Sequence, residues 1–552
     1  MSFLRKKIKK GKPYWYVVKK IRIGKTVKDE WEVYLGTVEN ILKKFQSVVP
    51  TENIKLKSYQ FGKLAALLAI DEELGFTQIV NKLTNKKKIQ GLTVGEYLLV
   101  TIFGRWCGPL SKKATAEYFD KSFLKFYYNI PHKMNTQNIL NHMKYIKDKE
   151  KINAISDKIT KRLMSKGIVP TILNFDTTNF STNIEKVGEL SRKGNAKNKR
   201  FDKNIVGLGL VVNEDNIPFI HETFPGNVHD SKILPEIVDR IVARLKTLKI
   251  DPESITIVMD KGNNSEENIE KITEEKKMHM VGSLKRDQVR DLLNIHLQKF
   301  DFLYTNKKKH EIRGYRTKLD VFGQEFTVVV SHNPATEKRQ RMTYENSKRK
   351  FLDGMKKLNM KYERVEGRGR KMCQAGAIQN ASKLVHNNFQ SVFKYEIYTK
   401  PKELKYWIDE GKEKELYSAF GKNTIFTDLH GWTSEQIVKT YNTKYILEND
   451  FKWLKDKLLI PITPIYVWTD ESIRVHVFLC VVGLLFMRYF LWRMKDIGVR
   501  DSELLEALEN IRVSLVSNRE NMKKVKMVVE EMDTIQSRVF SRFDMGRYLQ
   551  MN

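Results

Sequence analysis

Two aspartates are the first candidates for catalytic side chains. Asp176 and Asp260 each end an apolar, β-branched segment, in the stretches TILNFD and ITIVMD. Such segments are typical of buried strands, and open α/β sheets bind their ligands where strands end. A single carboxylate in this position usually caps the following turn or helix. Two such carboxylates, each after an apolar segment, indicate instead that both belong to one site at the edge of a sheet.

A third acid lies far along the chain, on a predicted helix. Thr433 and Gln436 form a capping box that predicts a helix from about Ser434 to Lys457. At 100° per residue, an arc of about 60° on this helix holds four side chains. They are Tyr441, Lys444, Glu448 and Lys455. We expect this face to pack toward the strand ends; the alternative is a surface helix with ion pairs such as Glu448 to Lys452.

Three carboxylates without a His or Cys cluster suit divalent cations that prefer oxygen ligands. Asp176, Asp260 and Glu448 could together hold two Mg²⁺ ions roughly 3.5 to 4 Å apart, with Mn²⁺ as a substitute. Such a pair of ions activates a water or a 3′ hydroxyl and stabilises the departing oxygen of an in-line displacement. Lys444 and Lys455 would hold phosphates beside the metals. These residues therefore predict metal-dependent phosphoryl transfer.

Charge and composition point to nucleic acid as the partner. The 552 residues include 99 Lys and Arg against 66 Asp and Glu, a net charge of +33. A surface of this charge repels itself unless a polyanion such as double-stranded DNA neutralises it. The hydrophobic content of 41% is typical of a globular chain and argues against a disordered basic tail protein.

Cysteines and apolar segments bear on the compartment. Three scattered cysteines at positions 107, 373 and 480 fit neither a disulfide framework nor a four-thiolate zinc site. No secretory signal is visible at the N-terminus. The stretch Val475–Trp492 is about as long as a membrane span, but it contains His476 and Arg488. We expect a buried core helix, no membrane partner, and a cytoplasmic, nucleoid-associated protein.

The pattern along the chain predicts an α/β fold in six regions. Strand, strand, strand, helix, strand, helix, strand follow one another from Ile168, with the first three strands as a meander. The regions are a basic β-hairpin region with Gly24-Lys25 as its turn (1–54), a helical DNA-binding or supporting domain (55–166), the first part of a catalytic core (167–284), an inserted β-containing subdomain (285–424), the second part of the core with the Glu448 helix (425–500) and a C-terminal helical region (501–552).

Three ordered motifs resemble those of insertion-sequence transposases with a DDE catalytic triad, in the group marked by a YREK signature. They are LNFDTTNFS around Asp176, IVMDKGNNSEENI around Asp260, and the spacing of Tyr441, Lys444, Glu448 and Lys455. The stretch GLVVNEDNIPFIHETFPGNVHDSK is also similar to the family, and the resemblance runs over roughly residues 170–480. Lys444 stands where the signature has Arg, which keeps the charge but loses bidentate phosphate geometry.

The resemblance implies a ribonuclease-H-like mixed-sheet core with a β-containing insertion before the catalytic Glu. It implies that Asp176, Asp260 and Glu448 are metal ligands, while the DNA contacts near the scissile phosphate are Tyr441, Lys444 and Lys455. It also implies homodimers that bind terminal inverted repeats, cut both strands and join the freed 3′ ends to target DNA. In some relatives a Trp of the insertion stacks on a flipped base. Trp407 and Trp432 are candidates, although we interpret both as buried core residues.

Two other function classes share the charge and the fold. One is a non-catalytic DNA-binding or regulatory protein derived from a transposase, and the three intact acids argue against it. The other is a nuclease on the same core that never joins strands. Among further signals, His221, His229 and Asp230 are interpreted as structural or turn-forming rather than as a metal site. The basic runs Ser191–Lys203 and Lys338–Lys350 either touch phosphates or form solvated faces.

Overall fold

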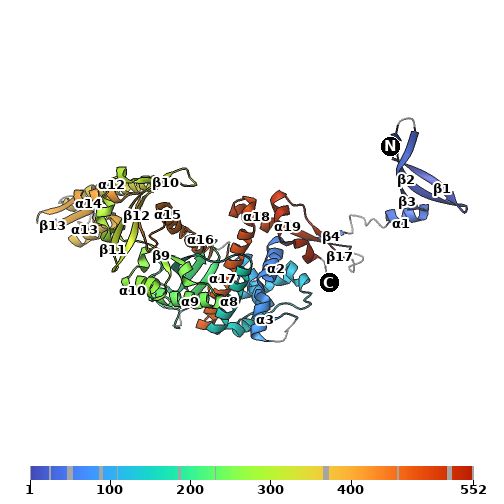
Figure 1. Cartoon of the computed structure of the whole chain (residues 1–552), viewed down its shortest axis with the longest axis horizontal. Helices are drawn as coiled ribbons and strands as arrows, with labels where there is room; N and C mark the ends of the chain where they lie inside the picture. The colour runs from blue at the N-terminus through green and yellow to red at the C-terminus, as the bar shows by residue number, and fades with distance from the viewer. Residues whose placement is uncertain are drawn as a thin grey trace. The chain divides into compact units, whose positions relative to one another are not determined.

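The chain divides into two units. Figure 1 shows the course of the chain, coloured by residue number. The computed structural model describes residues 2–23, 26–46, 54–85, 91–108, 110–184, 188–229, 232–364, 372–456, 459–518 and 525–549. The first unit contains residues 1–69, 121–129 and 497–552. The second contains residues 70–120 and 130–496, and it carries every predicted site residue.

The first unit begins with a three-stranded antiparallel sheet, of order β1-β2-β3, and a short helix. Its elements are β1 Ser2–Lys9, β2 Lys12–Ile23, β3 Thr26–Gly36 and α1 Val38–Gln46. The prediction of one hairpin is therefore incomplete, because residues 2–9 add a third strand; its proposed turn at Gly24-Lys25 lies outside the described residues. Cross-strand ion pairs offset part of the positive charge: Arg5 and Lys7 pair with Asp29 and Glu32.

A second small sheet of the first unit joins distant parts of the chain. It has the order β17-β16-β4, built from β4 Ile54–Gln60, β16 Arg512–Asn518 and β17 Val525–Val529. The prediction of a helical C-terminal region, residues 501–552, is wrong for β16 and β17. The predicted helical region 55–166 begins with strand β4, which was not predicted either. The remaining helices are α6 Phe123–Tyr127, α18 Asp501–Asn510 and α19 Thr534–Arg542, while α2 Gly62–Leu74 runs from the first unit into the second.

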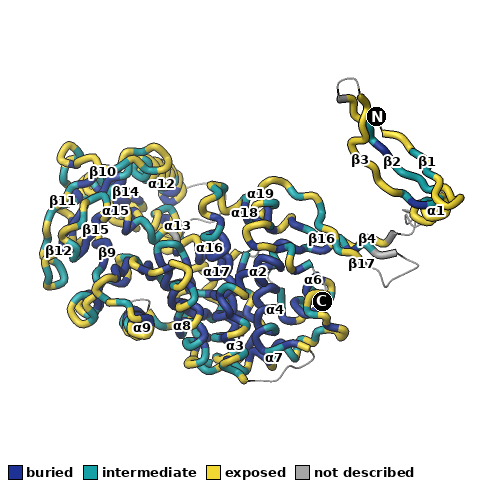
Figure 2. The backbone as a smooth tube through the Cα atoms, turned by 45° about the vertical axis from the view of Figure 1, so that its right-hand side comes forward, coloured by how far each residue is buried: buried dark blue, intermediate teal, exposed yellow. Residues whose placement is uncertain are grey.

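One half of the second unit is helical. Its helices are α3 Phe76–Thr84, α4 Val94–Trp106, α5 Lys112–Lys121, α7 Thr136–Met143, α8 Lys149–Ser165 and α17 Asp470–Arg493. Within the described residues, α17 alone is long and apolar enough to cross a membrane, yet 94% of its most apolar window is buried in the protein. Figure 2 shows this burial along α17 and α4, and the Trp106 indole donates to the Gly483 carbonyl at 2.9 Å. The prediction of a core helix is confirmed.

The other half is built on a nine-stranded mixed sheet of order β10-β11-β12-β15-β9-β8-β5-β6-β7. Its strands are β5 Ile172–Thr182, β6 Asn204–Asn213, β7 Pro218–Pro225, β8 Thr256–Met259, β9 His279–Ser283, β10 Asp301–Thr305, β11 Glu311–Val321, β12 Gln324–His332 and β15 Lys422–Thr427. As predicted, β5, β6 and β7 form an antiparallel meander, and β8 and β9 return parallel to β5. The mixed α/β class is confirmed, and the sheet is consistent with a ribonuclease-H-like core.

Helices between the strands cover this sheet. They are α9 Leu234–Leu248, α10 Glu266–Glu270, α11 Arg290–Leu293, α15 Ser434–Asn442 and α16 Tyr445–Trp453. Helix α9 presents Leu234, Ile237 and Ile241 to a core that includes Phe175 of β5. The predicted start of this helix at Asp230 lies outside the described residues, and the helix itself begins at Leu234.

The predicted insertion, residues 285–424, is divided by the structure. Strands β10, β11 and β12 extend the main sheet, because the apolar run Val328–Val330 of β12 pairs with β15 and is fully buried. The rest forms a module with its own core, in which Phe351 stacks on Phe393 at 4.7 Å. Its elements are α12 Pro334–Glu363, α13 Gln374–Leu384, β13 Phe393–Thr399, β14 Lys402–Ile408 and α14 Glu410–Ala419.

Candidate active site

Two neighbouring parallel strands bring the aspartates together. In the register of β5 and β8, Phe175 lies opposite Met259, and this is the last pair. Asp176 and Asp260 are the next residue on each strand, so they lie side by side where the pairing ends. Each carboxylate accepts a hydrogen bond from the following backbone N–H: Thr177 to Asp176 at 2.7 Å and Lys261 to Asp260 at 2.8 Å. Asp260 directly follows the end of β8, as predicted, but the prediction that Asp176 ends its strand is wrong, because β5 continues to Thr182 in its pairing with β6.

The predicted single helix Ser434–Lys457 is wrong, because the structure breaks it at Thr443 and Lys444. The capping box of Thr433 and Gln436 starts α15 as predicted. Helix α15 then ends at Asn442, where the N–H groups of Thr443 and Lys444 bond to carbonyls three residues back. Helix α16 starts at Tyr445 and ends at Trp453. The angular positions calculated for a continuous helix therefore do not apply to Lys455, which follows the end of α16.

Asp260 is the centre of a cluster of polar side chains. Lys444 donates to its Oδ1 at 3.0 Å, and the Tyr441 hydroxyl lies 3.3 Å from the same atom. Lys444 also donates to the Tyr441 hydroxyl at 2.8 Å, and that hydroxyl donates to Ser283 of β9 at 2.7 Å. Lys444 and Tyr441, both predicted from the motif, thus reach the second aspartate.

The charges of this cluster shift its pKa values. Burial raises the pKa of the Asp260 carboxyl, but the Lys444 ammonium and the Lys261 N–H outweigh it, so the pKa lies below its ordinary value. Burial lowers the pKa of Lys444, but Tyr441 and Asp260 reverse this and raise it. Burial raises the pKa of Tyr441. Asp260 and Lys444 are therefore ionised and Tyr441 is neutral at neutral pH.

One face of β5 supports the segment that carries the third acid. Asn174, Asp176 and Thr178 are two residues apart along the strand, so their side chains share a face. The Thr443 hydroxyl donates to Asn174 Oδ1 at 2.7 Å, and Lys455 donates to the Thr178 hydroxyl at 2.6 Å. These contacts lie on either side of Asp176 along β5 and on either side of α16 along the chain. Helix α16 therefore runs across the face of β5 that holds Asp176.

Lys455 lies in the field of Asp176 and of a second lysine. Desolvation of its ammonium group lowers the pKa of Lys455, Lys197 lowers it further, and Asp176 acts in the opposite direction. The Lys197 ammonium donates to the Thr177 carbonyl at 2.6 Å and lies 3.3 Å from the Thr177 hydroxyl. Two cationic groups thus flank the first aspartate.

Glu448 is on α16 but on its exposed side. The core side of the helix holds Leu447 and Asp450, both fully buried, and Arg488 of α17 donates through Nε to Asp450 at 2.7 Å. In the described part of the chain, no group of three or more His, Cys, Asp or Glu side chains is placed to hold a metal ion. The structure therefore brings Asp176 and Asp260 together and does not add Glu448 to them.

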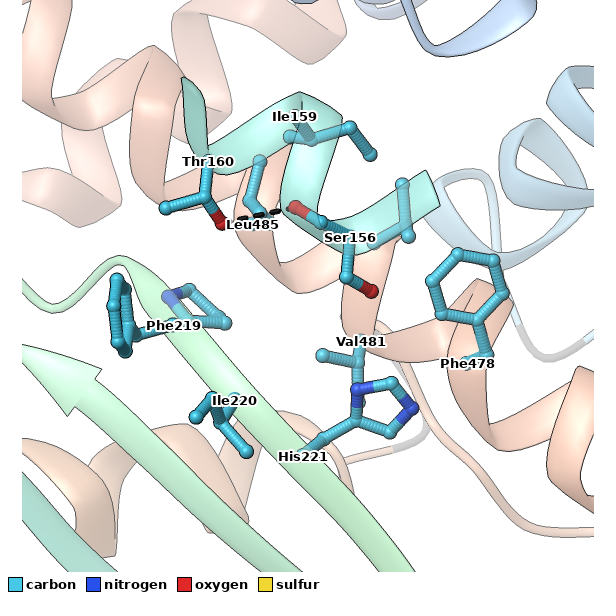
Figure 3. Close-up of a pocket in the computed structure, with 11 residues that line it drawn as sticks. Ser156, Ile159, Thr160, Phe219, Ile220, His221, Phe478, Val481 and Leu485 are labelled. Atoms are coloured by element: carbon cyan, nitrogen blue, oxygen red, sulfur yellow. Dashed lines mark hydrogen bonds between the residues drawn. The ribbon is translucent and has the colours of Figure 1, made fainter. Parts of the chain in front are cut away.

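A pocket in the same unit is not a catalytic cleft (Figure 3). It has a volume of about 20 Å³ and lies between α8, β7 and α17, with Phe219, Val481 and Leu485 in its lining. His221 stacks on Phe478 there, with ring centroids 5.6 Å apart. Burial, with Arg240 and Arg244 nearby, lowers the pKa of His221 to about 3, so the ring is neutral. The structural role predicted for His221 fits this position.

The two candidate stacking tryptophans differ in exposure. Trp407 lies on β14 and is 43% exposed, so its interpretation as a buried core residue is wrong. It shares the outward face of the β13–β14 ribbon with Lys394, its cross-strand partner. Trp432 is partly buried and packs against the core that contains Ile437 and Tyr441. Its backbone carbonyl accepts a hydrogen bond from Arg316 at 2.6 Å.

Several site residues were not predicted from sequence. Asn174 and Ser283 are buried polar residues within apolar strands, and Thr443 joins the helix break to β5. The signal for Asn174 was available, because a polar side chain two residues before Asp176 on a buried strand faces the same way. No sequence signal placed Lys197 next to Asp176. That contact depends on a loop folding back on its own strand.

Comparison with known protein families identifies the family of this chain. The family model described as "Transposase DDE domain" matches residues 170–464, which is more than half of the chain. The match spans the strands that carry Asp176 and Asp260 and both helices after Thr433. No curated protein sequence matches the chain.

Proposed function

Because the chain belongs to the family of transposases with a DDE domain, we propose that it binds terminal inverted repeats, cuts both DNA strands there and joins the freed 3′ ends to target DNA. Membership makes it a transposase, an enzyme of phosphoryl transfer on DNA. The observation that supports the finer proposal is the pair of aspartates on adjacent strands, just past the last residue pair of β5 and β8. Tyr441 and Lys444 contact Asp260, and Lys455 lies beside Asp176.

The donor set of this edge fits the divalent cations that the family uses. Asp176 and Asp260 offer hard carboxylate oxygens in neighbouring positions, which suit Mg²⁺, or Mn²⁺ in its place. We propose Glu448 as the third ligand, because its helix runs across the face of β5 that holds Asp176. Bound cations would activate the attacking water or 3′ hydroxyl and stabilise the leaving oxygen.

The roles of Lys444, Tyr441 and Lys455 depend on whether a cation is bound to the two aspartates. Lys444 now neutralises Asp260 through its Oδ1, and a cation on this carboxylate would weaken that contact and release the ammonium group. The released ammonium group is then placed to contact a phosphate of the DNA near the scissile bond. Tyr441, fixed by Ser283, limits where Lys444 can move. Lys455 provides a second phosphate contact beside Asp176.

Amide replacement of each acid tests the proposal. Asp176→Asn, Asp260→Asn and Glu448→Gln each keep the shape and remove the charge that a cation needs. On a linear DNA that carries the repeats flanking the gene, with Mg²⁺, we expect each variant to lose strand cleavage and to bind the ends as the unchanged protein does. Full cleavage by the Glu448→Gln protein would remove Glu448 from the mechanism.

The same assay separates the other function classes. Cleavage without any joining to a second DNA would indicate a nuclease on this core. End binding without Mg²⁺-dependent cleavage by the unchanged protein would indicate a regulatory DNA-binding protein. The proposal also includes a homodimer, since two transposon ends must be handled together. Sedimentation of the protein with and without end DNA tests that part, and a monomer in both states would contradict it.

A further inference from the structure

The basic loop after β5 does not present its cations equally. Lys193 donates to the Asp202 carbonyl, Arg200 pairs with the Asp202 carboxylate at 3.0 Å, and Lys203 donates to Asn183 at 2.5 Å. These contacts remain within the loop and the end of β5. Lys197 differs, because its ammonium group reaches back to Thr177, the residue after Asp176. The run Ser191–Lys203 is therefore not a uniform solvated face.

Polar side chains of β5 fix the position of Lys197. Asn179 accepts a hydrogen bond from the Lys197 N–H at 3.0 Å and donates to the Asn195 carbonyl at 2.9 Å. Ser181 and Asn198 bond to each other two residues further along the strand. The start of the loop is held by Asp470, which accepts from the Leu190 N–H at 3.3 Å. Several separate contacts thus hold the loop along the strand that carries Asp176.

This placement puts two positive charges beside the first aspartate. Lys197 binds Thr177, and Lys455 binds Thr178, the next residue of the strand. The two ammonium groups are near enough to repel each other, and Asp176 lies close to Lys455. Two like charges held together cost free energy that an anion between them would offset. A cation on Asp176 would neutralise the carboxylate that lies close to Lys455 and so increase the need for such an anion.

We infer that Lys197 and Lys455 form a two-lysine site for one phosphate of the substrate DNA, next to the phosphate that is cut. This inference rests on the proposed function and deepens it, because it adds a DNA-binding residue from outside the helical motif. Lysine suits the task as a compact point charge that binds phosphate without bidentate geometry. The loop closes on β5 from one side and the end of α16 from the other, so the phosphate would lie over Asp176.

Paired substitutions in the same loop test the inference. Lys197→Gln removes the charge beside Asp176, and Lys199→Gln makes the identical change at an exposed neighbour. Because one charge-assisted hydrogen bond to the phosphate is lost, we expect Lys197→Gln to slow end cleavage roughly 10- to 100-fold, which corresponds to about 1.4 to 2.7 kcal/mol. Lys199→Gln should change the rate less than about threefold, and both variants should melt at the temperature of the unchanged protein.

Replacing single DNA phosphates by an uncharged analogue identifies the phosphate that Lys197 contacts. Single methylphosphonates, placed one at a time at the phosphates flanking the cut, remove one negative charge from the DNA. The unchanged protein should lose cleavage rate at the position that Lys197 binds. The Lys197→Gln protein should lose nothing further at that position while it remains sensitive at the others. An equal loss at every position, or a lowered melting temperature, would make Lys197 a purely structural residue and overturn the inference.

A control separates this inference from the proposed function. Asp176→Asn should abolish cleavage on every substrate. If Asp176→Asn cleaves normally, the proposed active site fails. If Asp176→Asn is inactive but Lys197→Gln and Lys199→Gln behave alike, the two-lysine site alone fails.

Discussion

Two acid–base pairs lie on opposite sides of the segment that contains α16, and they differ chiefly in burial. Asp450 and Arg488 are 0% and 4% exposed in their side chains, and the Arg488 guanidinium stacks on Trp453 at 3.7 Å. Asp260 and Lys444 are 46% and 24% exposed, 3.0 Å apart. The first pair can exchange its partners only by unfolding. The second can exchange Lys444 for a ligand from solution.

The difference in burial explains why the two ion pairs have different roles. A buried pair is costly to break, because either partner alone would be an uncompensated charge in the core. It therefore ties α16 to α17 and sets where the backbone of the helix lies. A half-exposed pair contributes little to stability, because water screens it. It is available for chemistry, which fits a carboxylate that must bind a cation.

The largest effect we expect comes from the exposed pair. Asp260→Asn should lower the rate of Mg²⁺-dependent end cleavage by about 1000-fold or more, since a metal ligand supports several kcal/mol of transition-state stabilisation. The melting temperature should stay near that of the unchanged protein. Cleavage by gel assay and calorimetry measure the two quantities. A large loss of melting temperature would place Asp260 with the structural pair instead.

The buried pair should show the opposite pattern. Arg488→Met leaves Asp450 as an unpaired buried acid, and we expect a loss of about 3 to 5 kcal/mol in the free energy of unfolding. The double change Arg488→Met with Asp450→Leu should recover part of that loss, because apolar side chains can replace a buried pair. Urea unfolding measures both. If the single change costs less than about 1 kcal/mol, the pair does not anchor α16.

Substitutions of Lys444 in the exposed pair are expected to have effects of intermediate size. Lys444→Met should slow cleavage roughly tenfold, because one phosphate contact of about 1.5 kcal/mol is lost. Lys444→Arg keeps the charge and offers two parallel N–H groups to a phosphate, so it should cleave at least as fast as the unchanged protein. Single-turnover cleavage rates give the answer. Equal activity of the Met and unchanged proteins would contradict a DNA contact by Lys444.

The smallest effect is expected on the solvent side of α16. Lys452 is exposed on this helix, so Lys452→Ala should change the free energy of unfolding by less than about 0.5 kcal/mol. Urea unfolding measures this change, and the loss measured for the Arg488→Met protein serves as the reference. A larger change would show that an ion pair on the helix surface, rather than the buried pair, holds α16.

Much of the core could be predicted because its signals are local. The apolar runs before Asp176 and Asp260 identify strands β5 and β8, and the predicted meander of the first three strands is the one that β5, β6 and β7 form. Thr433 and Gln436 identify the start of α15, because a capping box involves only four consecutive residues. The break after Asn442 was missed, since it depends on the Thr443 hydroxyl bonding to Asn174, 269 residues earlier.

Long-range pairing also explains the errors outside the site. Strand β16 was predicted as helix, and its partner β4 lies more than 450 residues before it in the chain. Residues 301–332 were assigned to an insertion, but they add strands to the main sheet through β15. In each case the local pattern allows more than one structure, and the partner strand decides between them.

The sequence by itself determined which residues are candidates for chemistry: two acids that follow apolar strand segments, a motif with a third acid and two lysines, and a net charge suited to DNA. Only the tertiary structure decided how they meet. It put Asp176 beside Asp260, paired Lys444 with Asp260, brought Lys197 of the predicted basic run to the strand of Asp176, and placed Glu448 on the exposed side of α16. The physical reason is that side-chain type and local hydrogen bonding are properties of short segments, whereas register, burial and charge proximity arise from contacts between segments far apart in the chain.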